Sequence, residues 1–263
     1  VTIRGQLLRV GTIICEDMWH ADYAVNPGKI QAGHDIDLMI NISCSPWGWQ
    51  KNRARHENVR RLSGDIKVPF VYVNNVMPQN NGKNFVVFDG ASTVYNEYGD
   101  VAAYLPPYFV GTQDVIVTTG MSPVVYEETN DVPQLWRALE SGLRAYFETI
   151  PAHLRYVVIG LSGGIDSAVV AAMLVYILGP DRVVGINMPY GDYNSTMTKD
   201  AAKALATNLG ITYHVMPIDD DVNTQAKRHG VAPGSGPFKT IQAIARMTVL
   251  AGHASMIGGI YTC

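Results

Sequence analysis

Residues 156–179 read YVVIGLSGGIDSAVVAAMLVYILG, an apolar strand pattern that ends in a short polar and glycine turn and continues as a helix. Gly163 and Gly164 are able to take backbone angles closed to other residues, and they let main-chain N–H groups approach a ligand closely. Ser162 and Ser167 add hydroxyls, and the positive end of the following helix points to the same place. The turn therefore predicts a pyrophosphate cradle.

Asp166 lies in the same turn, although a carboxylate repels a phosphate. Its natural role is to share Mg²⁺ with phosphate oxygens, because Mg²⁺ is bound through carboxylates together with substrate phosphates. The turn differs from the Walker pattern, since it has neither the Lys nor the longer glycine spacing. An ordinary tight strand-to-helix turn is the alternative interpretation, but the full S-G-G-x-D-S pattern at a strand end favours nucleotide binding.

Strand and helix patterns alternate on both sides of this turn. A helical face of Trp136, Leu139, Leu143 and Tyr146 follows Pro133, and three further alternations include the strands YVVIGLS, VVGINMP and TYHVMPI. Such alternation predicts a parallel sheet with helices on both faces. We therefore expect a doubly wound α/β domain over residues 121–263.

The earlier part of the chain has a different texture. From residue 6 to about 118, short β-rich runs are separated by Gly, Pro, Asn and Asp turns: LLRVGTIIC, IDLMINIS, VPFVYVNNV, NFVVFDGASTVYN, VAAYLP and DVIVTT. One helix pattern interrupts them at QKNRARHENVRRLSGDI, residues 50–66. We expect a first domain over residues 1–120, with the boundary near residue 120.

Composition narrows the class of partner. The formal net charge is −3 and no basic run is present, which argues against nucleic-acid or membrane-surface binding and favours small molecules. The apolar runs are broken well short of the ~20 residues that a membrane span needs. The three cysteines, Cys15, Cys44 and Cys263, have no metal-ligand spacing and are too few for a disulfide framework, which fits a reducing cytoplasm.

The glycine turn resembles the signature of the ATP pyrophosphatase superfamily, whose members split ATP between the α and β phosphates and let a nitrogen nucleophile displace AMP. The segment INMPYGDYNSTMTKDAAKALATNLGITYHVMPI is similar to the NAD synthetase branch of that superfamily. The resemblance implies that Met188 lies near the adenine of ATP. It also implies an ATP-binding loop of Leu161, Ser162, Gly163, Gly164, Ile165, Asp166 and Ser167, with Asp166 on Mg²⁺.

The segment TIQAIARMTVLAGHASMIGGIY resembles the N-I-Q-A-R-x-R-M helix of the same branch. Gln242, Ala243, Arg246 and Met247 match, whereas Thr240 stands where the family has an Asn that contacts deamido-NAD and Ile244 stands in place of an Arg. The resemblance implies a deamido-NAD contact at Thr240, weakened or rearranged. An amphipathic helix packed on the sheet is the plain interpretation of the same residues.

Cys15 follows an apolar strand pattern in VGTIICEDMWH, at the point where the chain turns. A lone Cys is more often a small buried hydrophobe than a nucleophile. Its neighbours, NISCSPWGWQKNRARHENVRRL and VPFVYVNNVMPQNNGKNFVVFDGAS, follow at the spacings of the nitrilase-like amidase fold. They resemble in particular the glutaminase domain that is fused to NAD synthetase.

This second resemblance implies that Cys15 attacks the side-chain amide of glutamine, forming a thioester and releasing ammonia. The N–H of Glu16 would help to hold the oxyanion, and its carboxylate would bind the amino group of glutamine. Ser45 matches a glutamine-binding Ser, and Lys51 stands where the family often has an Arg for the α-carboxylate. Taken on their own, Ser45 and Lys51 are a turn hydroxyl and a solvated helix start.

The resemblance covers nearly all 263 residues, but only the second half of one catalytic domain and the first half of the next. The family's general-base Glu and stabilising Lys are expected upstream of Cys15, and its T-G-N-K-S-E loop is expected just after Cys263. We therefore expect a fragment: the C-terminal half of a nitrilase-like α-β-β-α sandwich, followed by the N-terminal part of an adenine nucleotide α-hydrolase-like domain.

The implied reaction is glutamine-dependent, ATP-driven amidation of deamido-NAD by a homo-oligomer. Two alternatives stay open at this point. One is another amidotransferase of the ATP pyrophosphatase superfamily, and the other is a truncated or decayed chain that binds nucleotide without catalysis.

Overall fold

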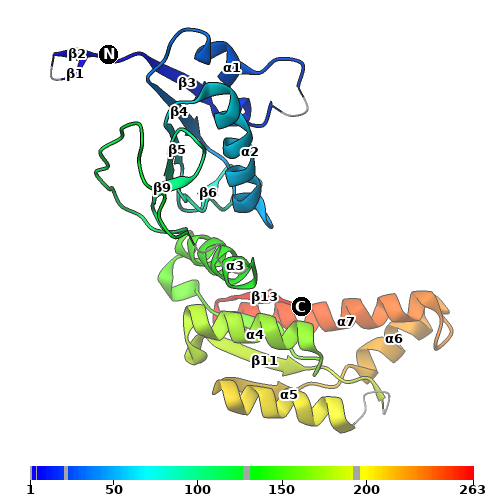
Figure 1. The fold of residues 1–263 in the computed structure, drawn as a ribbon. Coiled ribbons are helices and arrows are strands. Elements are labelled where there is room, and N and C mark those ends of the chain that lie inside the picture. Colours follow the sequence, from blue (N-terminus) through cyan, green and yellow to red (C-terminus); the bar gives the residue numbers. More distant parts are fainter. Residues whose placement is uncertain (1, 4, 21–22, 127–130, 192–195) are drawn as a thin grey trace. The chain divides into compact units, whose positions relative to one another are not determined.

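The computed structural model describes residues 2–3, 5–20, 23–126, 131–191 and 196–263 (Figure 1). The chain divides into two compact units, Val1–Ala145 and Tyr146–Cys263. This division falls near the end of helix α3 (Asp131–Glu148), whereas the change in sequence texture predicts a boundary near residue 120. Contacts and sequence texture are different criteria, so the boundary at residue 120 stays a prediction.

The first unit is built on a five-stranded sheet with the order β3-β4-β5-β8-β9. Strands β3 (Val10–Ile14), β4 (Leu38–Ser43) and β5 (Phe70–Asn74) run parallel to one another. Strands β8 (Thr93–Tyr95) and β9 (Val101–Tyr104) are antiparallel to their neighbours. Two short antiparallel pairs accompany the sheet: β1 (Thr2–Ile3) with β2 (Gln6–Leu7), and β6 (Gln79–Asn80) with β7 (Phe85–Val86).

Helices α1 (Pro27–Ala32) and α2 (Lys51–Ile66) cover one face of this sheet. Their apolar side chains share a buried core with the inward residues of the strands, including Met39, Val59, Leu62 and Phe70. The opposite face carries a row in register across three parallel strands, Ile14, Ile42 and Val73, with exposed fractions of 65%, 55% and 44%. The sheet therefore has one helix-covered face and one face with exposed apolar side chains.

The second unit holds a four-stranded sheet with the order β12-β11-β10-β13, and every pairing in it is parallel. The strands are β10 (Val157–Gly160), β11 (Val183–Asn187), β12 (Thr212–Val215) and β13 (Ile260–Thr262). The helices between them are α4 (Ile165–Leu178), α5 (Thr196–Leu209), α6 (Asp219–His229) and α7 (Gly236–Ile257). The expectation of a doubly wound parallel sheet is confirmed.

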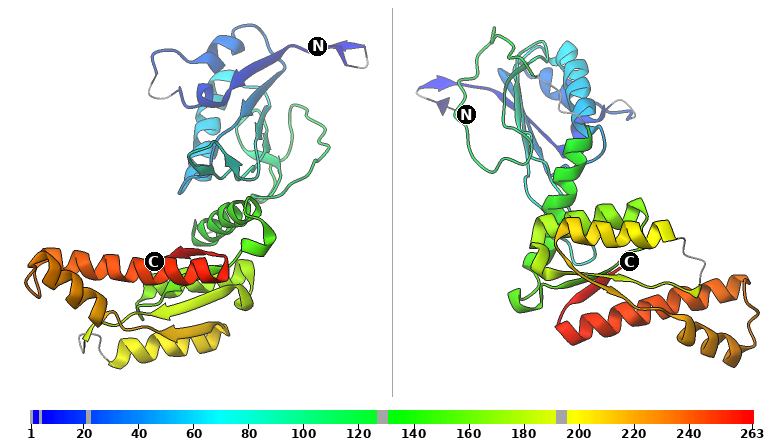
Figure 2. Two further views of the ribbon diagram at one scale, coloured as in Figure 1. Left: turned by 180° about the vertical axis from the view of Figure 1, so that it is seen from behind. Right: turned by 90° about the horizontal axis from the view of Figure 1, so that it is seen from below.

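Both faces of the second sheet are covered, because alternate residues of β10 enter two separate cores. Val157 and Ile159 pack with residues of α4 and α5 and with Phe147 at the end of α3. Val158 packs with residues of α6 and α7, among them Val222, Ala245 and Leu250. Figure 2 shows the sheet of this unit between these two layers of helices.

Most of the expected elements are present, with one exception in the first unit. The run DVIVTT, residues 114–119, forms no strand, and Ile116 is 87% exposed. The run NFVVFDGASTVYN contains two strands, β7 and β8, instead of one. The helix expected at residues 50–66 is α2, which begins at Lys51. Within the described residues, no helix combines the length and apolar character needed to cross a membrane.

Candidate functional site

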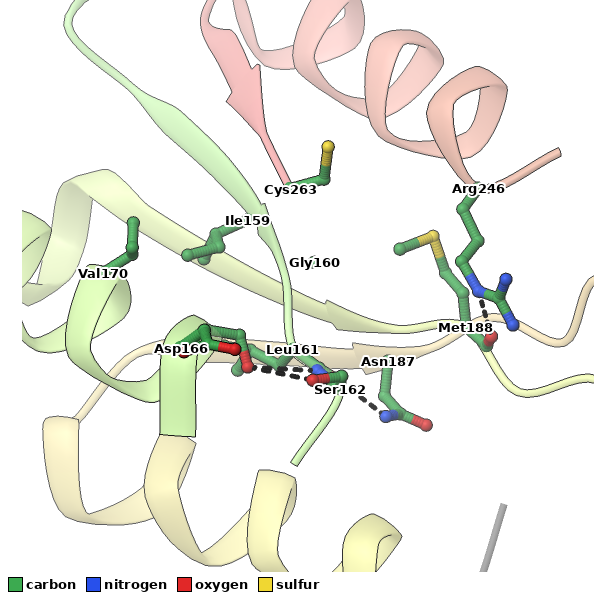
Figure 3. Close-up of a pocket in the computed structure, with 11 residues that line it drawn as sticks. Ile159, Gly160, Leu161, Ser162, Asp166, Val170, Asn187, Met188, Arg246 and Cys263 are labelled. Carbon is green, nitrogen blue, oxygen red and sulfur yellow. Dashed lines mark hydrogen bonds between the residues drawn. The ribbon is translucent and has the colours of Figure 1, made fainter. Parts of the chain in front are cut away.

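The second unit has a cavity of about 380 Å³ at the carboxyl ends of β10 and β11 (Figure 3). This edge is where open parallel α/β sheets bind their ligands. The cavity is bordered by the glycine turn, by the residues that follow β11 and by α7. The residues that line it are Ile159, Gly160, Leu161, Ser162, Asp166, Ser167, Val170, Asn187, Met188, Arg246 and Cys263.

The glycine turn is closed by its own hydroxyls. The N–H of Gly164 donates to Oγ of Ser162 at 3.2 Å, and Oγ of Ser167 donates to the carbonyl of Gly164 at 3.1 Å. Gly163 has a φ of +86°, in the left-handed region that favours glycine. Helix α4 begins directly afterwards, and the first turn of a helix leaves backbone N–H groups without intrahelical acceptors. The turn has the polar groups of an anion-binding loop.

The residues that the sequence predicts to bind ATP occupy different positions around this turn. Leu161 and Met188 are buried, at 1% and 7% exposure, and both border the cavity. Asp166 is exposed in the first turn of α4 and also borders the cavity. Ile165 is 74% exposed and does not border the cavity.

Helix α7 contributes Arg246 to the cavity, and Nε of Arg246 donates to the carbonyl of Met188 at 3.3 Å. Burial lowers the pKa of Arg246. Thr240, the predicted deamido-NAD contact, is exposed on the same helix and donates to the carbonyl of Gly236 at 3.4 Å. Thr240 does not border this cavity.

Asn187 is a cavity residue that the sequence patterns did not indicate. Its side chain is 2% exposed, and its Nδ2 donates to the carbonyl of Leu161 at 2.6 Å, which ties the end of β11 to the glycine turn. The sequence does mark this position, because Asn187 is a polar residue at the end of the otherwise apolar strand VVGIN.

In the first unit, Cys15 directly follows β3 and opens a short 3₁₀ helix, Cys15–Met18. Its φ of +42° is unusual for a residue with a Cβ and costs roughly 1–2 kcal/mol. Asp17 accepts from the N–H of Ile14 at 2.8 Å, and Asn41 donates to the carbonyl of Cys15 at 3.4 Å. These contacts hold a half-buried thiol at a sharp turn after a parallel strand.

Glu16 and Lys51 border one open cavity of about 620 Å³ together with Trp19 and Trp49. Nζ of Lys51 lies 5.8 Å from the ring centre of Trp19. Burial lowers the pKa of Lys51, and the nearby guanidinium of Arg55 lowers it further. The carboxylate of Glu16 accepts from the hydroxyl of Tyr23 at 2.8 Å.

Ser45 lies two residues after β4 and is 3% exposed. Its N–H donates to Oδ1 of Asn74 at 2.8 Å, and its carbonyl accepts from Nδ2 of the same side chain at 3.1 Å. Neither Ser45 nor Cys15 borders the cavity of Glu16 and Lys51. Four residues are predicted to act on the substrate glutamine. The structure thus places two of them, Glu16 and Lys51, on one cavity, and the other two, Cys15 and Ser45, just after the ends of adjacent strands.

Comparison with known proteins identifies relatives of both units. Residues 135–261 match the family model described as NAD synthase. The chain is 30% identical over 223 residues to a glutamine-dependent NAD(+) synthetase of Synechocystis sp., covering 80% of this chain and 39% of that protein. It is 27% identical over 260 residues to the protein of that name from Acinetobacter baylyi, covering 96% of this chain and 46% of the relative.

A solved structure is similar to this chain along nearly its whole length. The glutamine-dependent NAD+ synthetase of Acinetobacter baumannii in complex with ADP matches with a TM-score of 0.77 and 27% identity, covering 99% of this chain and 48% of that one. The present chain thus spans less than half of the length of these relatives.

Proposed function

We propose that this chain, whose residues 135–261 match the family model described as NAD synthase, takes part in glutamine-dependent synthesis of NAD from deamido-NAD and ATP. One observation carries the proposal: the same chain holds a glycine turn with the polar groups of an anion-binding loop at the end of a parallel sheet, and a strained cysteine at the end of a parallel strand in a second, mixed sheet. The relatives that span both units carry the name of an enzyme that couples glutamine to NAD synthesis.

In the first unit, Sγ of Cys15 attacks the side-chain carbonyl carbon of glutamine. The C–N bond breaks, ammonia leaves, and water then hydrolyses the thioester to glutamate and the free thiol. The N–H of Glu16 stabilises the oxyanion, because a backbone donor placed where negative charge develops lowers the barrier. Lys51 and the carboxylate of Glu16 bind the two charged groups of the amino acid, and Ser45 contacts it as well.

In the second unit, the turn Leu161–Ser167 holds the phosphates of ATP while Met188 borders its adenine. The nicotinate carboxylate of deamido-NAD attacks the α-phosphorus and pyrophosphate leaves. Ammonia then attacks the adenylated carbon and AMP leaves, giving the amide of NAD. Adenylation is needed because a carboxylate resists nucleophiles.

Asp166 is the residue that would hold Mg²⁺. It borders the cavity beside Ser162 and Ser167, and among the described residues no three His, Cys, Asp or Glu side chains form a metal cluster. A single carboxylate fits Mg²⁺ delivered with a nucleotide, since this ion is usually held by one or two carboxylates and by substrate phosphates. When bound, Mg²⁺ neutralises phosphate charge. Asp166 itself orients the metal-nucleotide at the start of α4.

The nucleophile is tested by Cys15→Ala in the protein at its natural length. We expect loss of NAD synthesis with glutamine as the nitrogen source and retention of synthesis with added ammonium chloride, because only the first half-reaction needs the thiol. Steady-state rates with the two nitrogen sources measure this. Equal loss with both sources would mean that Cys15 is structural.

The metal role is tested by Asp166→Ala, with NAD synthesis from ammonium chloride as the readout. We expect a loss of at least about a hundredfold, because electrostatic stabilisation at a reacting centre contributes on this scale. Isothermal titration of Mg-ATP should show weakened binding, whereas Cys15→Ala should leave it intact. A rate near that of the parent protein would refute the metal role.

We further propose a cytoplasmic homo-oligomer as the working form. The three cysteines, too few for a disulfide framework, support a reducing compartment. Light scattering of the purified protein would measure the oligomer.

A further inference from the structure

An ion pair lies in the core of the first unit, apart from the residues that the proposed reaction uses. Arg55 and Asp89 are each 1% exposed. Nη1 of Arg55 donates to Oδ2 of Asp89 at 2.7 Å, and Nη2 donates to Oδ1 at 2.9 Å. The guanidinium also lies 5.5 Å from the ring centre of Tyr72. It is a bidentate pair, which fixes geometry as well as charge.

A buried pair of this kind is a poor source of stability. Removing two charges from water costs several kcal/mol for each ion, and well-packed apolar side chains of similar volume are often equally stable or more so. The presence of Arg55 and Asp89 in the core therefore indicates a role in specifying a local geometry.

The pair fixes the position of the peptide backbone at Ser45. Nη2 of Arg55 donates to the carbonyl of Ser45 at 3.2 Å in addition to its bond with Asp89. Asn74 binds both the N–H and the carbonyl of the same residue. The backbone of Ser45 thus receives contacts from α2 and from the end of β5, while Asp89 orients the guanidinium.

Arg55 also lies four residues after Lys51 on α2, one turn along the same helix. Its positive charge lowers the pKa of Lys51, and the charge of Asp89 acts in the opposite direction. The pair therefore contacts Ser45 directly and acts electrostatically on Lys51, and both of these residues are predicted to bind the substrate glutamine.

We infer that Arg55 and Asp89 are positioning residues that fix the Ser45 segment for glutamine binding, an inference that rests on the function proposed above. Asp89 holds the guanidinium in one orientation, and the guanidinium holds the carbonyl of Ser45. Neither Arg55 nor Asp89 borders the cavity of Glu16 and Lys51. Its loss should raise the KM for glutamine and leave the synthetase reaction with ammonia unaffected.

The test is the double variant Arg55→Met/Asp89→Leu in the protein at its natural length, since replacing both partners leaves no unpaired buried charge. A matched control is Arg60→Met/Asp100→Leu. It removes the exposed ion pair between Arg60 on the same helix and Asp100, whose side chains are 66% and 42% exposed. We expect a rise of about tenfold in the KM for glutamine in the first variant. The kcat with ammonium chloride and the melting temperature should stay near those of the parent, and the control should match the parent throughout.

Arg55→Lys provides a second route, because it keeps the charge beside Asp89 and removes the fork that reaches Ser45. If the double variant does not unfold cooperatively, the KM of Arg55→Lys for glutamine tests the inference instead, and we expect it to rise as well. A KM for glutamine within twofold of the parent in the folded variants would overturn the inference while leaving the proposed function standing. A parent protein that uses ammonia and never glutamine would overturn both the glutaminase proposal and this inference.

Discussion

At the scale of single residues, the backbone angle of Gly163 is the sharpest constraint in the glycine turn. Its φ of +86° is open to glycine, and a side chain there costs roughly 1–2 kcal/mol. Gly163→Ala should therefore shift the turn and weaken ATP binding at least about tenfold, measured by isothermal titration. Gly252→Ala is a suitable control, because a Cβ at this position of α7 meets nothing within 4 Å and alanine favours helix. Equal ATP affinity in all three proteins would contradict the need for this turn geometry.

Single residues also show which features of a site a local sequence pattern can indicate. The glycine turn and the position of Cys15 can be recognised from a few consecutive residues at the end of a strand pattern. The positions of Arg55 and Asp89 are not, because the two residues lie 34 positions apart and each is an ordinary charge in its own segment. Asn74 was missed for the same reason, since its partner Ser45 lies 29 positions earlier. Buried polar contacts between distant segments require the folded sheet.

At the scale of elements, α2 combines polar and apolar packing in one helix. Burial, together with the positive charges of Arg55 and Arg60, lowers the pKa of its His56 from 6.5 to about 4. The hydroxyl of Tyr95 lies 2.8 Å from Nδ1 of His56, and Nε2 is buried with no hydrogen-bond partner among the described residues. The folded protein therefore holds this imidazole in the neutral form at neutral pH.

The neutral imidazole of α2 makes stability depend on pH. The unfolded chain binds a proton below about pH 6.5 that the folded chain takes up only near pH 4, so stability is lost as the pH falls through this window. His56→Gln should reduce the drop in unfolding free energy between about pH 7 and pH 4.5 by about 2 kcal/mol, measured with urea. His34→Gln, at an exposed position, should show the drop of the parent. The same drop in all three proteins would contradict a buried neutral His56.

The elements also show how far periodicity predicts the fold. Helix α2 and the strands of both sheets follow their apolar patterns, because each buries one or both faces. The run at residues 114–119 has the same β-branched composition and yet forms no strand. A strand needs a paired neighbour and a face to bury, and the 87% exposure of Ile116 shows that this run lacks the buried face.

At the scale of the whole molecule, the exposed row of Ile14, Ile42 and Val73 makes association the expected behaviour of residues 1–263 on their own. Contiguous apolar side chains on an open sheet face favour burial against another surface. Ile42→Thr/Val73→Thr keeps β-branched residues at exposed positions, so it should lower aggregation with little change in melting temperature. Ile13→Thr, at a buried position of β3, should instead lower the stability by about 2 kcal/mol. Static light scattering and thermal unfolding distinguish the two outcomes, and undiminished aggregation in the double variant would show that another surface drives it.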